Sequence, residues 1–111
     1  MITRIFRARV PVELHEEFER DFLPRIIEAI KSYPGVVSTG IGLPTRCGPE
    51  EYAVISIWAS TKFLAAFAGD SWDEPTLPAG MEKYVTECWV HHYKMYTPPS
   101  PQPPAMEPQL G

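Results

Sequence analysis

The chain has 111 residues, which fits a single domain, and its 44% apolar and 22% charged residues are close to globular averages and exclude wholesale disorder. Ten basic against 14 acidic residues give a net charge of −4, so the cationic excess typical of nucleic-acid binding is missing. No apolar run approaches the roughly 20 residues of a membrane-spanning helix, and Met1–Val10 lacks the apolar block of a signal peptide. We therefore expect a cytoplasmic protein that binds neither nucleic acid nor membrane.

Proline and cysteine divide the chain further. Six of the 13 prolines lie in residues 97–111 (TPPSPQPPAMEPQLG), which predicts an extended tail outside a folded domain of residues 1–96. Cys47 and Cys88 are far apart and form no CxxC motif, so we expect free, buried thiols rather than a disulfide.

The first two elements have clear periodicities. Ile2–Val10 alternates between two faces, which predicts a strand whose apolar face is interrupted only by Arg4. Pro11 then suits a helix start, and an apolar stripe runs every three to four residues as far as Tyr33, where Pro-Gly ends the helix. Pro24 interrupts this stripe and should kink the helix. The stripe comprises Leu14, Phe18, Phe22, Ile26 and Ile30.

The rest of the chain reads as three strands and a short helix. The expected elements are strands Val36–Leu43 and Glu51–Ala59, helix Thr61–Ala68 capped by Ser60 or Thr61, one or two helical turns over Met81–Val85, and strand Thr86–Tyr96. The order is β-α-β-β-α-β, an α+β ferredoxin-like plan with a four-stranded antiparallel sheet and both helices on one face.

The third predicted strand suggests how the other face is used. Its alternation puts Tyr52, Val54, Ser56 and Trp58 on one side, and we expect this side to be the one the helices leave uncovered. Such an apolar face would not remain in water. We therefore expect a homodimer in which two sheets pack face to face and leave a chamber in each subunit.

Three segments carry a family resemblance. They are WASTKFLAAFAG at 58–69, Trp72 with Pro75, and VHHYKM at 90–95. Together they resemble the antibiotic biosynthesis monooxygenase-like family, whose members share a strand-ending Trp, a short AFAG helix and a final His-Tyr strand. The resemblance covers about residues 2–96 and implies a dimeric α+β barrel.

The same resemblance bears on activity. It implies a cofactor-independent oxygenase for hydroxylated aromatics or quinols, or a haem-degrading enzyme. Haem-degrading relatives have a histidine on the second helix, and Thr61–Ala68 contains none, which argues against haem chemistry. The family's His-Tyr pair corresponds to His92 and Tyr93.

His92 is the candidate catalytic base, because imidazole titrates near neutral pH. His91 and His92 are adjacent on a strand and must point to opposite faces. We expect His92 to face the chamber, since Tyr93 and Met95 suit packing under the helices, although His91 remains open as the chamber-facing residue. The alternative is a structural histidine bonded to backbone.

The candidate substrate-binding residues are Trp58, Tyr52, Ser56, Arg7 and Arg9. Trp58 would wall an aromatic pocket or simply belong to the core. The two arginines would hold a carboxylate or phenolate, or pair with acids such as Glu87. No spacing converges on a metal site, and no nucleotide-binding motif is present, so we predict neither metal nor cofactor.

The resulting hypothesis is a cofactor-independent monooxygenase that acts on a small hydroxyaromatic or quinol-like substrate in a chamber of a homodimer. His92 would remove a phenolic proton, and Trp58 and Tyr52 would hold the ring. The alternative is a non-catalytic dimeric module that binds a small apolar ligand or only itself.

Overall fold

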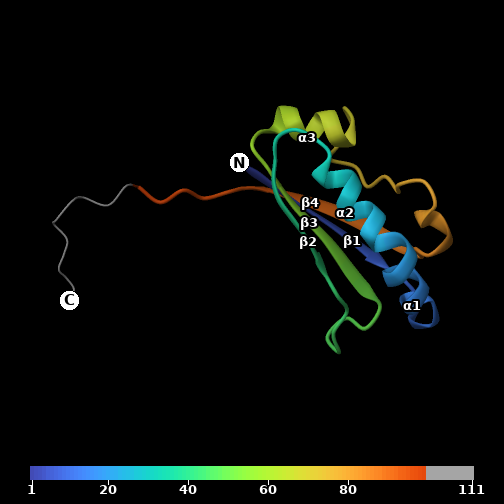
Figure 1. The fold of residues 1–111 in the computed structure, drawn as a ribbon. Helices are drawn as coiled ribbons and strands as arrows, with labels where there is room; N and C mark the ends of the chain where they lie inside the picture. The colour runs from blue at the N-terminus through green and yellow to red at the C-terminus, as the bar shows by residue number, and fades with distance from the viewer. Residues whose placement is uncertain (100–111) are drawn as a thin grey trace, which may run out of the picture.

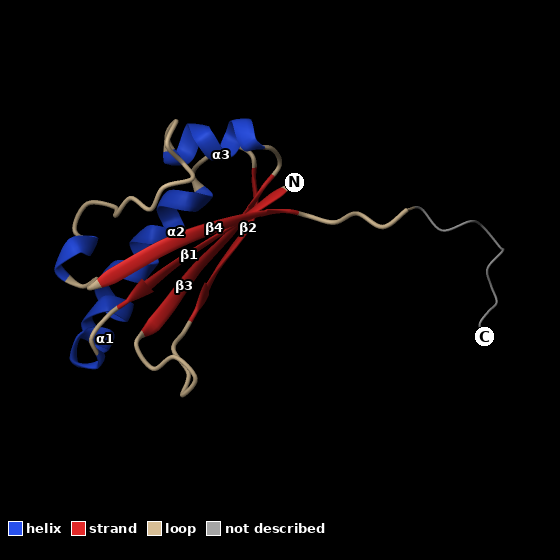
Figure 2. Cartoon of the chain, turned by 180° about the vertical axis from the view of Figure 1, so that it is seen from behind, coloured by secondary structure: helices blue, strands red, loops and turns tan. Residues whose placement is uncertain are grey.

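The computed structural model describes residues 1–99 and has one sheet covered on one side by helices (Figure 1). The elements are β1 (Ile2–Arg9), α1 (His15–Glu17), α2 (Leu23–Lys31), β2 (Val36–Gly42), β3 (Glu51–Trp58), α3 (Thr61–Ala68) and β4 (Glu87–Lys94). The strand order is β2-β3-β1-β4 with antiparallel neighbours throughout. The α+β ferredoxin-like prediction is confirmed, and the helices lie together on one face of the sheet (Figure 2).

Two expectations concern the ends of the chain and membranes. From residue 100 onwards the predicted proline-rich tail lies outside the described residues. Within residues 1–99, no helix is both long enough and apolar enough to cross a membrane.

The first predicted helix is irregular in its first half and becomes a regular α-helix only from Leu23 onwards. It begins as a 3₁₀ turn (Val12–Leu14), continues as α1, widens into a π-helical segment (Phe18–Phe22) and becomes α2. The Leu23 N–H donates to the Phe18 carbonyl five residues earlier, immediately before Pro24. Because Pro24 has no N–H and its ring crowds the preceding turn, the wider turn accommodates it. The predicted interruption therefore takes the form of a π segment.

The helices cover the opposite face from the one we expected. Tyr52, Ser56 and Trp58 are 1%, 1% and 0% exposed and belong to the core beneath the helices. Arg4 pairs with Ser56 and with His92 across β1, so both of these partners share that face. The expectation that this set is left uncovered is wrong. Alternation shows which residues share a face, but both faces of this sheet are apolar and the pattern does not say which one the helices cover.

The open face carries the other set of side chains. Ile55 is 36% exposed, and Tyr93 and Met95, which we expected under the helices, are 51% and 43% exposed. Ile5, Ala53, Ile57 and Trp89 share this face and are partly exposed. The placement of Tyr93 and Met95 was therefore also wrong.

Local details differ from prediction at two further sites. Ser60 precedes α3 as its N-cap residue, but no side-chain hydrogen bond caps the helix. Both thiols are free as expected, yet Cys47 is exposed and only Cys88 is partly buried. The Cys47 position in the β2–β3 connection explains this, because connecting segments run over the surface.

Candidate functional site

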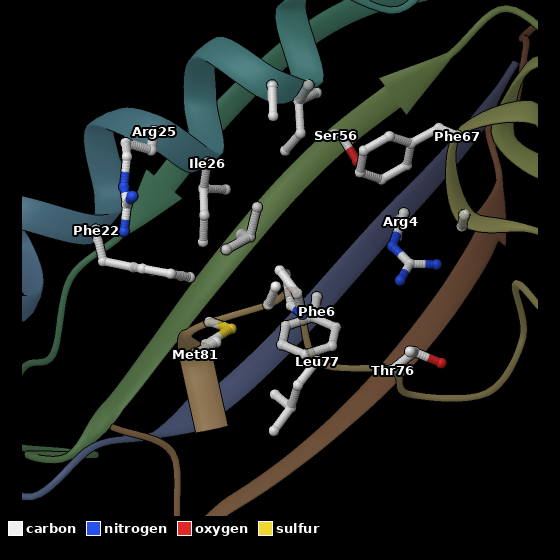
Figure 3. Close-up of a pocket in the computed structure, with 16 residues that line it drawn as sticks. Arg4, Phe6, Phe22, Arg25, Ile26, Ser56, Phe67, Thr76, Leu77 and Met81 are labelled. Atoms are coloured by element: carbon white, nitrogen blue, oxygen red, sulfur yellow. The ribbon is translucent and has the colours of Figure 1, made fainter. Parts of the chain in front are cut away.

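A cavity of about 430 Å³ lies between the sheet and the helices. Its floor is formed by side chains that point from the two central strands towards the helices, namely Arg4 and Phe6 of β1 and Val54 and Ser56 of β3. Figure 3 shows these strands crossing beneath the side chains of α2. A cavity of this size and apolar character is typical of a small-molecule site.

The other walls come from segments distant in the sequence. The buried stripe of α2 contributes Ile26 and Ile30, α3 contributes Phe67, and the segment from Thr76 to Met81 closes the remaining side (Figure 3). This last segment belongs to the connection between α3 and β4, in which Gly69 and Gly80 both have positive φ angles, 92° and 90°. Such backbone turns favour glycine and allow the chain to fold back over the cavity.

Arg4 is the one charged side chain on the cavity floor. It is only 7% exposed. Its Nη1 donates a hydrogen bond of 2.8 Å to the carbonyl oxygen of Trp72 and lies 3.1 Å from Nε2 of His92. Burial lowers the pKa of Arg4, but a guanidinium stays protonated in proteins. Arg4 is therefore the donor and His92 the acceptor in their contact.

His92 lies behind Arg4 and is not among the residues that line the cavity. Its ring packs edge-to-face against Trp72, with the ring centroids 4.6 Å apart. Burial, and then the positive charge of Arg4, lower the pKa of His92 below its usual value, with an opposing contribution from Asp73. The imidazole is thus held neutral, with its Nε2 lone pair directed at Arg4. His91 is exposed on the opposite face.

Trp58 and Tyr52, which were expected to hold the substrate ring, pack in the core and do not line the cavity. Trp58 stacks on Phe67, with centroids 5.0 Å apart, and its Nε1 donates to Ser56 Oγ at 2.9 Å. The Tyr52 hydroxyl donates to Glu19 at 2.6 Å, and burial together with this carboxylate raises the Tyr52 pKa. Of the three, Ser56 lines the cavity. Trp58 and Tyr52 do not line the cavity, so they would influence a ligand only through the side chains packed against them.

The predicted anion-binding arginines lie elsewhere. Arg7 and Arg9 project from the open face of β1, where Arg7 pairs with Glu51 at 3.4 Å and Arg9 pairs with Glu87 at 3.1 Å. Pairing with acidic side chains is the second of the two roles expected for these arginines. The sheet separates both pairs from the cavity. The role of these arginines in holding a substrate remains a prediction without support from this geometry.

Arg4 is a cavity residue that is not among the residues expected from the sequence. The signal was present, because a charged residue interrupted an otherwise apolar face between Ile2 and Phe6. A charge is almost never fully buried without a reason. By contrast, no periodicity marked Leu77 as a cavity residue, since it belongs to an irregular segment. Met81 begins the 3₁₀ helix Met81–Lys83, which lies where helical turns were expected over Met81–Val85.

The histidines do not come together for metal binding. Nε2 of His15 lies 2.7 Å from the Val10 carbonyl oxygen on the helical side, His91 faces outward, and His92 contacts Arg4. Across residues 1–99, no group of three or more His, Cys, Asp or Glu side chains is arranged to hold a metal ion.

Comparison with solved structures identifies the fold. A candidate antibiotic biosynthesis monooxygenase from Deinococcus radiodurans superposes with a TM-score of 0.68 at 14% identity, covering 92% of this chain and 99% of that one. A similar candidate from Nitrosomonas europaea gives 0.64 at 18% identity, over 87% and 100%. The haem degrader MhuD from Mycobacterium tuberculosis, solved with two haems in its active site, gives 0.66 at 19% identity, over 90% and 100%.

No family model matches the sequence, and no curated protein matches it. The structural similarities nevertheless extend over nearly the whole of each compared chain, and the sheet has the expected four antiparallel strands. The chain therefore has the antibiotic biosynthesis monooxygenase-like fold.

Proposed function

We propose that the protein is a cofactor-independent monooxygenase that oxidises a small hydroxyaromatic or quinol-like substrate in the cavity between its sheet and its helices. The observation that carries this proposal is the cavity itself, whose walls are mainly aromatic and aliphatic and whose floor meets a polar cluster at one end. The fold shared with monooxygenase-type structures supports the reaction class.

The chemistry requires only dioxygen as oxidant. Loss of a proton converts the substrate hydroxyl into an electron-rich anion, which transfers one electron to O₂ and gives a phenoxyl radical and superoxide. Their recombination forms a carbon–oxygen bond and gives a peroxide anion. The protonated base returns its proton to this peroxide, and loss of water then leaves a quinone. One oxygen atom of O₂ enters the product and the other leaves as water, so the protein supplies proton removal, orientation and a water-poor cavity.

His92 is the proposed proton acceptor. Its neutral imidazole has a lone pair on Nε2, at present directed at Arg4. A substrate hydroxyl that replaces Arg4 Nη1 at this nitrogen would donate its proton there, and the guanidinium would remain beside the resulting anion. Ser56 Oγ lies on the same floor and offers a polar contact for the ring substituent.

Haem chemistry is not part of this proposal. Two structures with the same fold contain haem or a manganese porphyrin. Among the described cavity-lining residues, however, there is no histidine, cysteine or tyrosine to serve as the axial ligand of a haem iron. The sulfur ligand present, Met81, usually accompanies a histidine in haem proteins. The lining of the cavity, to which His92 does not belong, therefore provides no suitable axial ligand for a haem iron.

Oxygen uptake tests the proposed function. The purified protein should consume O₂ with at least one member of a panel of anthrones, naphthols and quinols, and ¹⁸O₂ should label the product with one oxygen atom. Ala68→Trp should block turnover because Ala68 lines the cavity, whereas Ala66→Trp, on the exposed side of the same helix, should retain it. Equal uptake by both variants would contradict the location of the site. No uptake across the panel would favour the non-catalytic ligand-binding module.

We also propose that a second copy packs on the open face of the sheet. Ile55, Tyr93 and the other partly exposed apolar side chains of this face form a surface more apolar than a monomer usually leaves in water. A 96-residue domain also gains stability from burying it. Sedimentation velocity should give a dimer for the wild type and a monomer for Ile55→Asp, and a monomeric wild type would contradict the proposal.

A further inference from the structure

We propose that Arg4 is an anion-binding, specificity-determining residue, and that the cavity selects aromatic ligands that carry a negatively charged oxygen at one end. The shared chemistry is an anionic oxygen on an apolar ring system, either a carboxylate or an ionised hydroxyl. This inference rests on the cavity of the proposed function and names its ligand class, but it does not require the reaction with oxygen.

Arg4 carries a buried positive charge that no carboxylate within residues 1–99 neutralises. The residue is 7% exposed. Removing a guanidinium from water costs free energy unless a partner charge or several hydrogen bonds replace the water. The hydrogen-bond partners of Arg4, the Trp72 carbonyl and the His92 imidazole, are both neutral. The Phe6 ring, whose centroid lies 5.9 Å from the guanidinium carbon, carries no charge either. The site therefore has one positive charge that a ligand can neutralise.

Arg4 also has N–H donors that no protein group uses within residues 1–99. Both hydrogen bonds between Arg4 and the protein use Nη1. The N–H groups of Nε and Nη2 have no hydrogen-bond acceptor within the described part of the chain, and the side chain lines the cavity. Figure 3 shows the guanidinium between Phe67 and Thr76, at one end of the cavity. A planar guanidinium with free N–H groups is well suited to bind a carboxylate or a phenolate.

The lining as a whole carries a net positive charge. The residues around the cavity include two arginines, Arg4 and Arg25, and no aspartate or glutamate. Arg25 is exposed at the opposite end, where its guanidinium lies 5.6 Å from the centre of the Phe22 ring (Figure 3). Both charges favour an anion within the cavity. Arg7 and Arg9 differ, because each already has a carboxylate partner.

The cavity between Arg4 and Arg25 indicates the size and polarity of the rest of the ligand. Phe6, Phe22, Ile26, Val54 and Leu77 surround the middle of the cavity with apolar atoms. A volume of about 430 Å³ with this lining suits a bicyclic or tricyclic ring system rather than a sugar or a peptide. The preferred ligand is therefore a fused aromatic with one acidic oxygen that reaches Arg4.

Binding measurements under anaerobic conditions test this inference apart from catalysis. Calorimetric titration of the wild type should show tighter binding of 2-naphthoate than of neutral 2-naphthamide by roughly 10- to 100-fold, the range that a charge-assisted hydrogen bond gives. Arg4→Met should remove this preference and leave 2-naphthamide binding nearly unchanged. Arg46→Met, at an exposed arginine in the β2–β3 connection, is the control and should retain the preference.

A second probe distinguishes the two kinds of anionic oxygen. The absorption of 2-naphthol shows whether its hydroxyl is ionised, and bound 2-naphthol should ionise at a lower pH than free 2-naphthol if the cavity takes phenolates. Selectivity for naphthoate without this shift would restrict the ligand class to carboxylates.

Several results would overturn the inference. These are equal affinity of the wild type for naphthoate and naphthamide, no binding of either, or a naphthoate preference that survives in Arg4→Met. If Arg4→Met does not fold, the ligand preference and the change in the Arg4 Nε–H resonance on addition of naphthoate to the wild type decide the question. Selective anion binding without oxygen uptake would uphold this inference and reject the proposed function. Oxygen uptake with neutral ligands alone would uphold the proposed function and reject this inference.

Discussion

Replacement of His92 with Ala is expected to lower the rate of oxygen uptake by roughly 10²- to 10⁴-fold, the usual contribution of a general base. Burial and the adjacent Arg4 charge keep this imidazole neutral and therefore able to accept a proton. The variant should fold, because His92 is partly exposed near the end of β4 and its principal contacts are with Trp72 and Arg4. The measurement is kcat/KM for the best substrate of the oxygen-uptake panel.

The same experiment has a built-in control and a pH signature. His91→Ala changes the neighbouring histidine on the exposed face and should leave turnover within about twofold of the wild type. Because the His92 pKa lies below the usual 6.5, the wild-type kcat/KM should fall only at pH values below 6.5, where the base becomes protonated. Loss of activity in His91→Ala but not in His92→Ala would identify His91 as the base. If kcat/KM of His92→Ala still falls at acidic pH as in the wild type, His92 is not the base.

Gly35→Ala is expected to destabilise the fold by roughly 2–5 kcal/mol, which combines backbone strain and a steric clash. Gly35 has a φ of +86°, where residues with a side chain are rarely found. A methyl group there would overlap the Cγ of Phe63 and lie 2.6 Å from its Cδ1. Gly35 also accepts the Ala59 N–H at 2.8 Å, so a shift of this turn would disturb the end of β3. Chemical denaturation measures the loss.

Two other glycines separate the contributions. Gly69 has a φ of +92° but open space around it, so Gly69→Ala should show the strain alone, about 1–2 kcal/mol. Gly40 has neither a positive φ nor any atom within 4 Å of an added methyl group, so Gly40→Ala should change stability by no more than about 0.5 kcal/mol. The expected order of destabilisation is Gly35, Gly69, Gly40. Equal effects at Gly35 and Gly40 would contradict the turn geometry and the position of Phe63.

Periodicity was sufficient to predict the elements of this fold. The bounds of α3 were predicted without error, and the strands were placed within one or two residues of their observed ends, because apolar alternation and Pro or Gly breakers mark them directly. His92 does share a face with Ser56, as expected, because both pair with Arg4. The ground for that expectation, the packing of Tyr93 and Met95 under the helices, is wrong. The bounds of the elements are local properties, and local sequence encodes them.

The location of the site depended on tertiary packing, which alternation does not encode. Tyr52 and Trp58 were assigned to the uncovered face because both faces of the sheet are apolar, and only the packing of α2 and α3 distinguishes them. Arg4 was set aside as an exception on its face, although its burial makes it the most informative residue of the site. The cavity wall from Thr76 to Ala79 comes from an irregular segment whose sequence has no repeating pattern.

The central claim is that the ligand site lies between the sheet and the helices, and methyl NMR tests it most directly. With 2-naphthoate added, the methyl resonances of Ile26, Val54 and Met81 should shift, because these side chains line the cavity. The methyl resonances of Ile55, which is exposed on the opposite face next to Val54, should not move. Shifts confined to Ile55, with Ile26, Val54 and Met81 unchanged, would contradict the account and place the ligand on the open face of the sheet.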